Sequence, residues 1–219
     1  MRARFSVDEI GRCALKIVER EGVAGLSMRG VASELGTGPM TLYNYVNGRE
    51  GLEQLVVDAI MQRVTLPPPV KDWRSDLEAT AAALWETLRA HPNAVPLILT
   101  RRSESASSFA PAERMIEALS RSRLDQLQIL AAFRATLALV TGSAQAEFAG
   151  IFAGTVLHDQ ANTVGAARIG EIAGADYPHI AALSEVSQQS SAAEDFRRGL
   201  AMLVSGIAST ERKHARQRQ

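Results

Sequence analysis

Three hydroxyl-bearing side chains stand at alternate positions in the first quarter of the chain. Thr41, Tyr43 and Tyr45 alternate with other residues, among them the apolar Leu42 and Val46. In a short helix, Leu42 and Val46 can face a core, which leaves the three hydroxyl groups near the outer side. Hydroxyl groups can bond to phosphate oxygens, and a threonine methyl group can contact thymine. The chemistry that suits this segment is contact with a nucleic acid.

A second group of polar side chains lies on an apolar stripe. Arg134, Thr141 and Gln145 share one side of a predicted helix, and Phe148 comes next along it. A buried arginine needs an acidic partner, access to solvent or a polar group of a ligand, because an unpaired buried charge is costly. The stripe therefore suggests a ligand pocket, with structural pairing of Arg134 as the alternative. Further pocket candidates, each with core packing as its alternative, are Trp85, Phe109, Met115, Phe133 and Phe152.

Catalytic and metal-binding patterns are missing from the sequence. The four histidines have no metal-ligand spacing, and Cys13 is the single cysteine. No nucleophile elbow, phosphate-binding loop or dinucleotide fingerprint is present. We expect a protein that is not an enzyme and holds no cofactor or metal. A small helical enzyme with its site around Arg134 is the competing hypothesis.

Composition favours helices but does not favour a nucleic acid partner. The 219 residues are 46% hydrophobic and 5% aromatic, and 24 basic residues balance 24 acidic ones. Residues 1–64 carry eight of each sign, so DNA contact would depend on where charges are placed. No apolar run reaches the roughly 18 residues of a membrane span, and no signal peptide is visible. We expect a cytoplasmic protein without a membrane partner.

Capping residues predict short helices at the start of the chain. Ser6 and Glu9 have the spacing of a capping box, and Gly22 can end the helix that follows. Ser27 can begin a second helix that Gly36 closes.

Two further helices follow the second. Pro39 suits the first turn of a third helix, and Asn47, three residues before Glu50, can cap a fourth. Two short helices that meet at Gly36 and are flanked by longer ones are typical of a helix-turn-helix, in which the second helix enters the major groove. An ordinary helical hairpin has the same spacing.

The remaining three quarters of the chain also read as helices. Beyond the proline run at 67–69, an amphipathic helix from Trp73 ends near His91, and the periodicity predicts helices at about 94–100, 111–121, 124–152 and 192–211. We expect a polar loop at 103–108, and a loop or a weakly packed helix at 154–176 that could cover a pocket. The helix at 124–152 is apolar on two sides, which suits a core on one side and a second subunit on the other; a purely intramolecular core is the alternative.

The stretch Gly25–Val46 resembles the tetracycline-repressor (TetR) family of transcription regulators, and so does Asn47–Leu52. The resemblance covers about residues 6–60, where Val31-Ala32-x-x-Leu35-Gly36 and Leu42-Tyr43-x-Tyr45-Val46 occur in the family's order. It implies an all-α homodimer: a three-helix DNA-binding head at 1–50, a connecting helix at about 47–64, and a helical ligand-binding and dimerisation domain at 65–219. It also implies a repressor that leaves a palindromic double-stranded DNA operator when a small-molecule effector binds.

The resemblance also implies which side chains contact DNA. Arg29 matches a position in the second helix that can contact a base or phosphate, and Arg49 stands where the family usually has a phosphate-binding lysine. The matching positions of the recognition helix are Pro39, Met40, Thr41, Tyr43 and Tyr45. A helical ligand-binding module that keeps the fold without specific operator binding is the alternative function.

Overall fold

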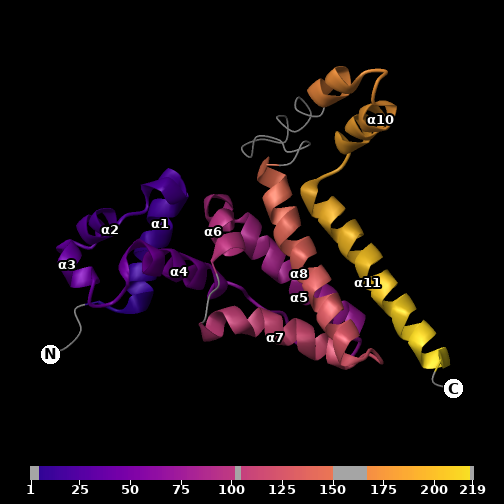
Figure 1. The fold of residues 1–219 in the computed structure, drawn as a ribbon, viewed down its shortest axis with the longest axis horizontal. Helices are drawn as coiled ribbons and strands as arrows, with labels where there is room; N and C mark the ends of the chain where they lie inside the picture. Colours follow the sequence, from indigo (N-terminus) through magenta and orange to yellow (C-terminus); the bar gives the residue numbers. More distant parts are fainter. Residues whose placement is uncertain (1–4, 102–104, 150–166, 218–219) are drawn as a thin grey trace. The chain divides into compact units, whose positions relative to one another are not determined.

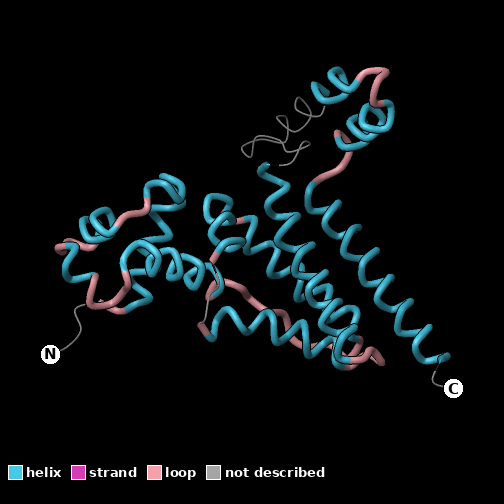
Figure 2. The backbone as a smooth tube through the Cα atoms, in the orientation of Figure 1, coloured by secondary structure: helices cyan, strands magenta, loops and turns pink. Residues whose placement is uncertain are grey.

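In a computed structural model, residues 5–101, 105–149 and 167–217 are described, and among them every regular element is a helix (Figures 1 and 2). The first helices are α1 (Val7–Gly25), α2 (Met28–Glu34), α3 (Pro39–Leu42), α4 (Gly48–Met61) and α5 (Trp73–Arg89). The later ones are η1 (Pro92–Ala94), α6 (Val95–Thr100), α7 (Ala106–Ser120), α8 (Gln126–Ala149), α10 (Pro178–Ser187) and α11 (Ala192–Gln217). The all-α fold class is confirmed.

The chain divides into two compact units. The first contains Met1–Leu66 and Glu86–Arg114, and the second contains Pro67–Trp85 and Met115–Gln219. The segment from Glu86 to Arg114, which holds η1 and α6, therefore packs with the first 66 residues, whereas the sequence led us to expect one domain over 65–219.

In the first unit, α1 packs along α4. Helix α1 begins at Ser6, whose hydroxyl group accepts a hydrogen bond from the Glu9 amide while the Glu9 carboxylate accepts one from the Ser6 amide. The predicted capping box is therefore confirmed. Gly11 lets the two helices approach closely, because a Cβ atom there would lie 3.0 Å from the carbonyl oxygen of Leu55. Alanine at position 11 would push α4 away from α1.

Two glycines end helical segments where the sequence predicts. Gly22 has a φ of 72° and interrupts the helical dihedrals of α1, so that only a short turn continues to Gly25. Gly36 has a φ of 62° after α2, a conformation that side chains with a Cβ rarely adopt. The cap predicted at Asn47 is wrong in one respect: Asn47 occupies the N-cap position of α4, but its side chain makes no capping hydrogen bond.

A buried histidine joins three parts of the first unit. His91, 8% exposed, has Nδ1 2.7 Å from Oε1 of Glu19 on α1, and Nε2 3.3 Å from Nη1 of Arg63. A guanidinium can only donate, so Nε2 accepts from Arg63 and the ring proton sits on Nδ1. Burial, followed by the nearby Arg63 charge, lowers the pKa of His91, although Glu19 acts in the opposite direction.

Acidification is expected to destabilise the protein through His91. Its native pKa lies below the ordinary value of 6.5. The unfolded chain therefore takes up the proton first as the pH falls below about 6.5. The free energy of unfolding should decrease from this group by at most about 1.4 kcal/mol per pH unit. Urea unfolding of wild type and His91→Gln at pH 7.5 and 5.5 measures this, and an equal pH dependence of the two proteins would contradict it.

In the second unit, α5 buries the apolar positions that the sequence predicts. Its residues Trp73, Leu77, Ala81 and Leu84 are buried there, and Leu88, in the part of α5 that belongs to the first unit, is buried as well. Trp85, 2% exposed, stacks on Phe196 of α11 with ring centroids 4.5 Å apart and planes 6° from parallel. The start of α5 is held by buried Asp76, which pairs with Arg121. Arg121 also donates to the carbonyl oxygen of Val70, at 2.7 Å.

The later helices differ from the sequence prediction in the start of α7, the presence of α10 and the end of α11. Helix α7 begins at Ala106, inside the predicted polar loop, and holds Pro111 within it. Residues 167–173 are helical, which agrees with the weakly packed helix that was one of the two expectations for 154–176, and α10 follows without having been predicted. The other part of that segment, 154–166, lies outside the described residues. Helix α11 begins at Ala192 as predicted and continues to Gln217.

Helix α8 is apolar around much of its circumference. By length and composition its residues Gln126–Ala146 are apolar enough to cross a membrane, which was not expected from the sequence, and 28% of that window is buried. Ile129, Thr136 and Val140 face the core of the second unit, and α11 packs alongside α8 (Figure 1). Leu127 and Leu130 are exposed by 79% and 41%. The prediction of a buried core face on one side holds, and the other side of α8 is uncovered in the single chain.

Candidate nucleic-acid interface and helical groove

The turn between α2 and α3 is built by apolar side chains on one face. Met28, Val31 and Ala32 of α2 and Leu42 of α3 are buried, and α2 packs against both α1 and α3. The Ser27 hydroxyl group accepts a hydrogen bond from the Gly30 amide at 3.1 Å, which starts α2. The buried side chains thus hold the two short helices α2 and α3 in place, and two short helices joined by a tight turn have the geometry of a helix-turn-helix.

The other face of this turn presents the predicted DNA-contacting residues. Arg29 is exposed, and Met40 and Tyr43 are exposed by 77% and 54%. Pro39 and Thr41 are half-buried. A methionine and a tyrosine so exposed gain nothing from packing within the single chain, so this face is suited to contact a partner.

Tyr45 also has a structural role that the sequence did not indicate. It is half-buried, and its hydroxyl oxygen accepts a hydrogen bond from the Phe5 amide at 3.3 Å. This bond ties the start of the chain to the segment after α3.

Arg49 is the second residue of α4 and is held from two sides. Its Nε donates to Oε1 of Glu53 at 3.0 Å, and its Nη2 donates to the carbonyl oxygen of Val23 at 2.9 Å. The Arg49 side chain is nevertheless 50% exposed. Its orientation is therefore set before any DNA approaches, and part of the guanidinium faces solvent.

The residues predicted to line a ligand pocket occupy different environments. Trp85 and Met115 are in the core at 2% and 1% exposed, and Phe133 is half-buried. Phe109, by contrast, is 58% exposed, and Arg134 reaches solvent.

Thr141 and Gln145 lie on the same side of α8 as Arg134. Both are half-buried, and the Thr141 hydroxyl group donates to the carbonyl oxygen of Leu137 at 2.9 Å. The predicted stripe that contains Arg134 is therefore mostly open to solvent and does not form a buried site. The side of α8 that faces the core is the side that carries Ile129. The side chain of Phe148 and all of Phe152 lie outside the described part of the structure.

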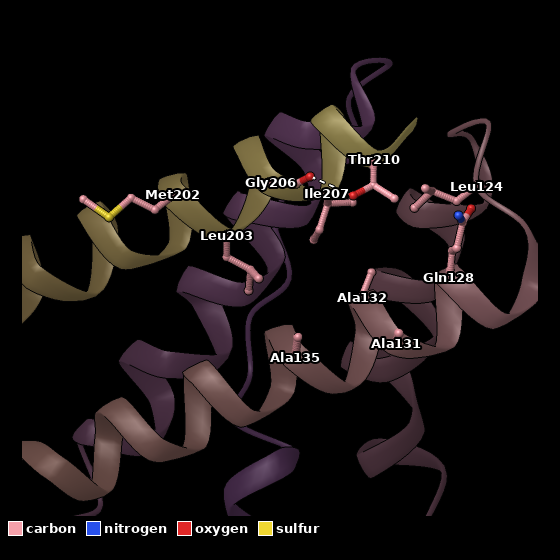
Figure 3. Close-up of a pocket in the computed structure, with 10 residues that line it drawn as sticks. All are labelled: Leu124, Gln128, Ala131, Ala132, Ala135, Met202, Leu203, Gly206, Ile207 and Thr210. Atoms are coloured by element: carbon pink, nitrogen blue, oxygen red, sulfur yellow. Dashed lines mark hydrogen bonds between the residues drawn. The ribbon is translucent and has the colours of Figure 1, made fainter. Parts of the chain in front are cut away.

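A shallow apolar groove of about 550 Å³ runs between α8 and α11 (Figure 3). Small residues form much of its floor, and larger ones form its ends. Its lining consists of Leu124, Gln128, Ala131, Ala132, Ala135, Met202, Leu203, Gly206, Ile207 and Thr210. The alanines of α8 and Gly206 of α11 leave room for another helix to approach closely.

Neither Cys13 nor the acidic and histidine side chains form a reactive site in the described residues. The structure contains no group of three histidine, cysteine, aspartate or glutamate residues there that could hold a metal. Cys13 is buried on α1, and burial raises the pKa of its thiol. Its Sγ lies 3.9 Å from the carbonyl oxygen of Val31, as expected of a core residue.

Comparison with known proteins decides the family. Residues 66–210 match the model of the tetracyclin repressor-like C-terminal domain. The chain belongs to the TetR family. A helix-turn-helix transcriptional regulator of Saccharopolyspora erythraea is 32% identical to this TetR-family chain over 205 residues, or 93% of the chain and 84% of the relative. The family resemblance of the first 60 residues is thereby confirmed, and the match extends it to the later helices.

A second relative and a solved structure agree with this assignment. The transcriptional repressor DrrR1 of Streptomyces coeruleorubidus is 31% identical over 145 residues, which are 65% of this chain and about half, 54%, of DrrR1. Apo ActR of Streptomyces coelicolor superposes with a TM-score of 0.81 over 98% of this chain and 100% of ActR, at 23% identity. ActR has also been solved with actinorhodin bound, with a TM-score of 0.80. The likeness to ActR shows the fold.

Sequence reasoning missed two charged residues beside the start of α4 in this TetR-family chain. The side chain of Glu53 is only 8% exposed, and Arg101, the C-cap of α6, contacts it. Glu53 lies four residues before Val57 on the buried side of α4, and this spacing could have indicated that Glu53 is buried. Nothing in the local pattern points to Arg101, because 48 residues separate the two.

Proposed function

We propose that this protein is a cytoplasmic, homodimeric transcription regulator that represses its target by binding a palindromic double-stranded DNA operator and leaves it when a small molecule binds. The observation that carries the proposal is the outer face of the helix-turn-helix. Arg29, Met40 and Tyr43 are exposed there while the opposite face of the same two helices is buried. A recognition surface of this kind suits the major groove.

The DNA contacts of the proposed interface fall into two classes. Met40 and Thr41, at the start of α3, suit base edges and thymine methyl groups, whereas Tyr43, Tyr45 and Arg49 suit phosphates. Arg29 can serve either purpose. Because residues 1–64 carry as many acidic as basic side chains, a few placed groups must supply the affinity.

Selection from random duplexes tests this function. The proposal expects recovery of a palindrome whose half-sites are centred about 34–36 Å apart, one turn of B-DNA. Binding of the recovered site should weaken steeply as salt rises, because phosphate contacts release counterions. A protein with no DNA affinity at low salt would instead be a ligand-binding module that keeps the fold.

The uncovered side of α8 and the groove beside α11 suit a second copy of the chain. Leu127, Leu130 and Met202 are exposed apolar side chains on these two helices. Two helices from each protomer would form a four-helix interface around a two-fold axis. This arrangement would also explain why α8 is so apolar, since an interface buries the surface that a single chain leaves open.

Replacing Met202 by glutamate is expected to break the dimer. Met202 is 74% exposed in the single chain and lines the groove, so a carboxylate there would be buried without a partner when two copies meet. Sedimentation velocity at micromolar concentration should give the 23.6 kDa of one chain. Operator affinity should fall in parallel, because two heads must bind together.

The neighbouring Ala201 supplies the control for this variant. Ala201 is exposed on α11 but does not line the groove. Ala201→Glu adds the same charge to the same helix and should remain a dimer. If the Met202→Glu protein kept the mass of a dimer, the groove would not be the interface.

A small-molecule effector is proposed to bind in the second unit. The candidates from the sequence that lie in this unit remain Trp85, Met115, Phe133, Arg134, Thr141, Gln145, Phe148 and Phe152. Phe109, the other candidate, belongs to the first unit and is 58% exposed. Trp85 and Met115 can offer apolar contacts from the core. That ActR holds actinorhodin supports a ligand-responsive regulator. Actinorhodin is therefore a practical first probe, and quenching of tryptophan fluorescence with release of the operator is the expected result.

A further inference from the structure

A compact cluster of four charged side chains lies at the start of α4. Nη1 of Arg101 is 2.5 Å from Oε1 of Glu50, and its Nε and Nη2 are 2.8 Å and 2.7 Å from Oε2 of Glu53. The other carboxylate oxygen of Glu53 accepts the hydrogen bond from Arg49 at 3.0 Å. Each oxygen of the buried Glu53 carboxylate thus has its own arginine.

We infer that Arg101 is a positioning residue for DNA binding: it neutralises Glu50 and Glu53 so that the guanidinium of Arg49 remains available to a backbone phosphate. This inference rests on the proposed operator binding through the start of α4. Arg101 belongs to the same compact unit as α4, and it is 35% exposed. It contacts the carboxylates rather than taking the place of Arg49.

The charge count explains why Arg101 matters. The cluster has two carboxylates and two guanidinium groups, so its net charge is zero. Without Arg101 the net charge becomes −1 beside the proposed phosphate contact: Glu53 keeps Arg49 as its partner in the cluster, whereas Glu50 loses the arginine that it contacts there. The carboxylates then hold Arg49 more tightly and repel the phosphate. Both effects weaken DNA binding without any change in the recognition face of α3.

The burial of Glu53 strengthens this assignment. A carboxylate that is 8% exposed needs charged partners, because desolvation of an unpaired charge is costly. With Arg101 in place, Arg49 need not provide all of this compensation and keeps half of its surface exposed. Arg49 also keeps its hydrogen bond to the carbonyl oxygen of Val23, which fixes the orientation of the Arg49 side chain. Arg101 therefore leaves the positive charge of Arg49, whose side chain is already oriented, available to a phosphate.

The experiment measures operator affinity and its salt dependence for Arg101→Gln in the full-length protein. We expect about tenfold weaker binding at 100 mM salt, as for loss of one charged contact. The slope of log K against log salt should become shallower by about one per protomer and should match that of Arg49→Gln. A purely structural tie between α6 and α4 would lower affinity without bringing the slope to the Arg49→Gln value.

Removing the excess negative charge provides the rescue. Glu50 has a 66% exposed side chain, so Glu50→Gln is tolerated by the fold. In the Arg101→Gln background it should restore most of the lost affinity and the steeper slope. Arg89→Gln is the matched control, because Arg89 is 33% exposed in the same unit, pairs with Glu86, and its loss changes the net charge equally. It should leave operator binding unchanged.

The outcomes separate this inference from the function on which it rests. If wild type binds no DNA, the proposed function fails and the inference falls with it. If wild type binds but Arg101→Gln binds equally well, or if Glu50→Gln does not rescue it, the inference alone is overturned. Should Arg101→Gln fold poorly by circular dichroism, Arg101→Lys decides the question, since it keeps the charge and should retain the salt slope of wild type.

Discussion

Replacing Tyr43 by alanine is expected to weaken operator binding by about tenfold or more per half-site while leaving stability almost unchanged. A hydrogen bond to a charged phosphate contributes about 1.5–3 kcal/mol, and 1.4 kcal/mol corresponds to a factor of ten in affinity. Tyr43 is 54% exposed, so its truncation leaves no cavity in the core. The free energy of unfolding should stay within about 0.5 kcal/mol of wild type. Fluorescence anisotropy with the selected operator, beside urea unfolding, measures both quantities.

Two further variants identify the cause of this loss. Tyr43→Phe keeps the ring and removes the hydroxyl group, so it should lose most of the same affinity if a phosphate accepts the hydrogen bond. Tyr177, in the second unit, is a tyrosine of similar exposure at 61%, and Tyr177→Ala should bind the operator normally. Equal weakening by Tyr43→Ala and Tyr177→Ala would show that Tyr43 does not contact DNA.

Replacing Trp85 by alanine is expected to give the largest loss of stability, about 3–5 kcal/mol of unfolding free energy. The side chain is 2% exposed and stacks on Phe196, so its removal loses both apolar burial and the ring contact between α5 and α11. Urea unfolding should be measured at one fixed protein concentration, because the stability of a dimer depends on concentration.

Trp85→Phe is the companion variant, since phenylalanine keeps a ring that can stack on Phe196. It should recover much of the stability that Trp85→Ala loses. A loss below about 1 kcal/mol for Trp85→Ala would show that the indole lies in a cavity that exists without it. Trp85 would then be a ligand contact rather than a core residue, which is the alternative that its sequence position left open.

Which features could be predicted from the sequence depends on how far apart in the chain the interacting residues lie. Prediction of the Ser6 capping box, the Ser27 cap and the break at Gly36 succeeded, because these features depend on bonds within about three residues. The buried stripe of α5 was also predictable, since a helix with one apolar face has one way to bury it. At Asn47 the same local rule failed, because the side chain makes no capping bond.

The two errors along the later helices have a physical reason. Pro111 suggested a helix start, yet α7 begins at Ala106 and holds Pro111 as its sixth residue, where proline removes one backbone hydrogen bond of the helix. Pro111 is buried there, so packing decides the start of this helix against the local preference of proline. Helix α8 is apolar on several sides, and periodicity alone does not say which side meets the core. Packing of α11 and the rest of the unit chose the Ile129 side and left Arg134 in solvent.

By itself, the sequence determined the helical class, the Ser6 and Ser27 caps and the helix-ending glycines of the head, because each follows from nearest neighbours or a repeating pattern. The residues proposed to face DNA came mainly from the resemblance of the first 60 residues to the TetR family. Only the tertiary structure decided that Tyr45 holds Phe5, that α8 and α11 enclose an apolar groove, and that Arg101 reaches Glu53. Those contacts join residues 40 or more positions apart, or separate helices. The free energy that selects them comes from packing and charge compensation between elements, which no local pattern encodes.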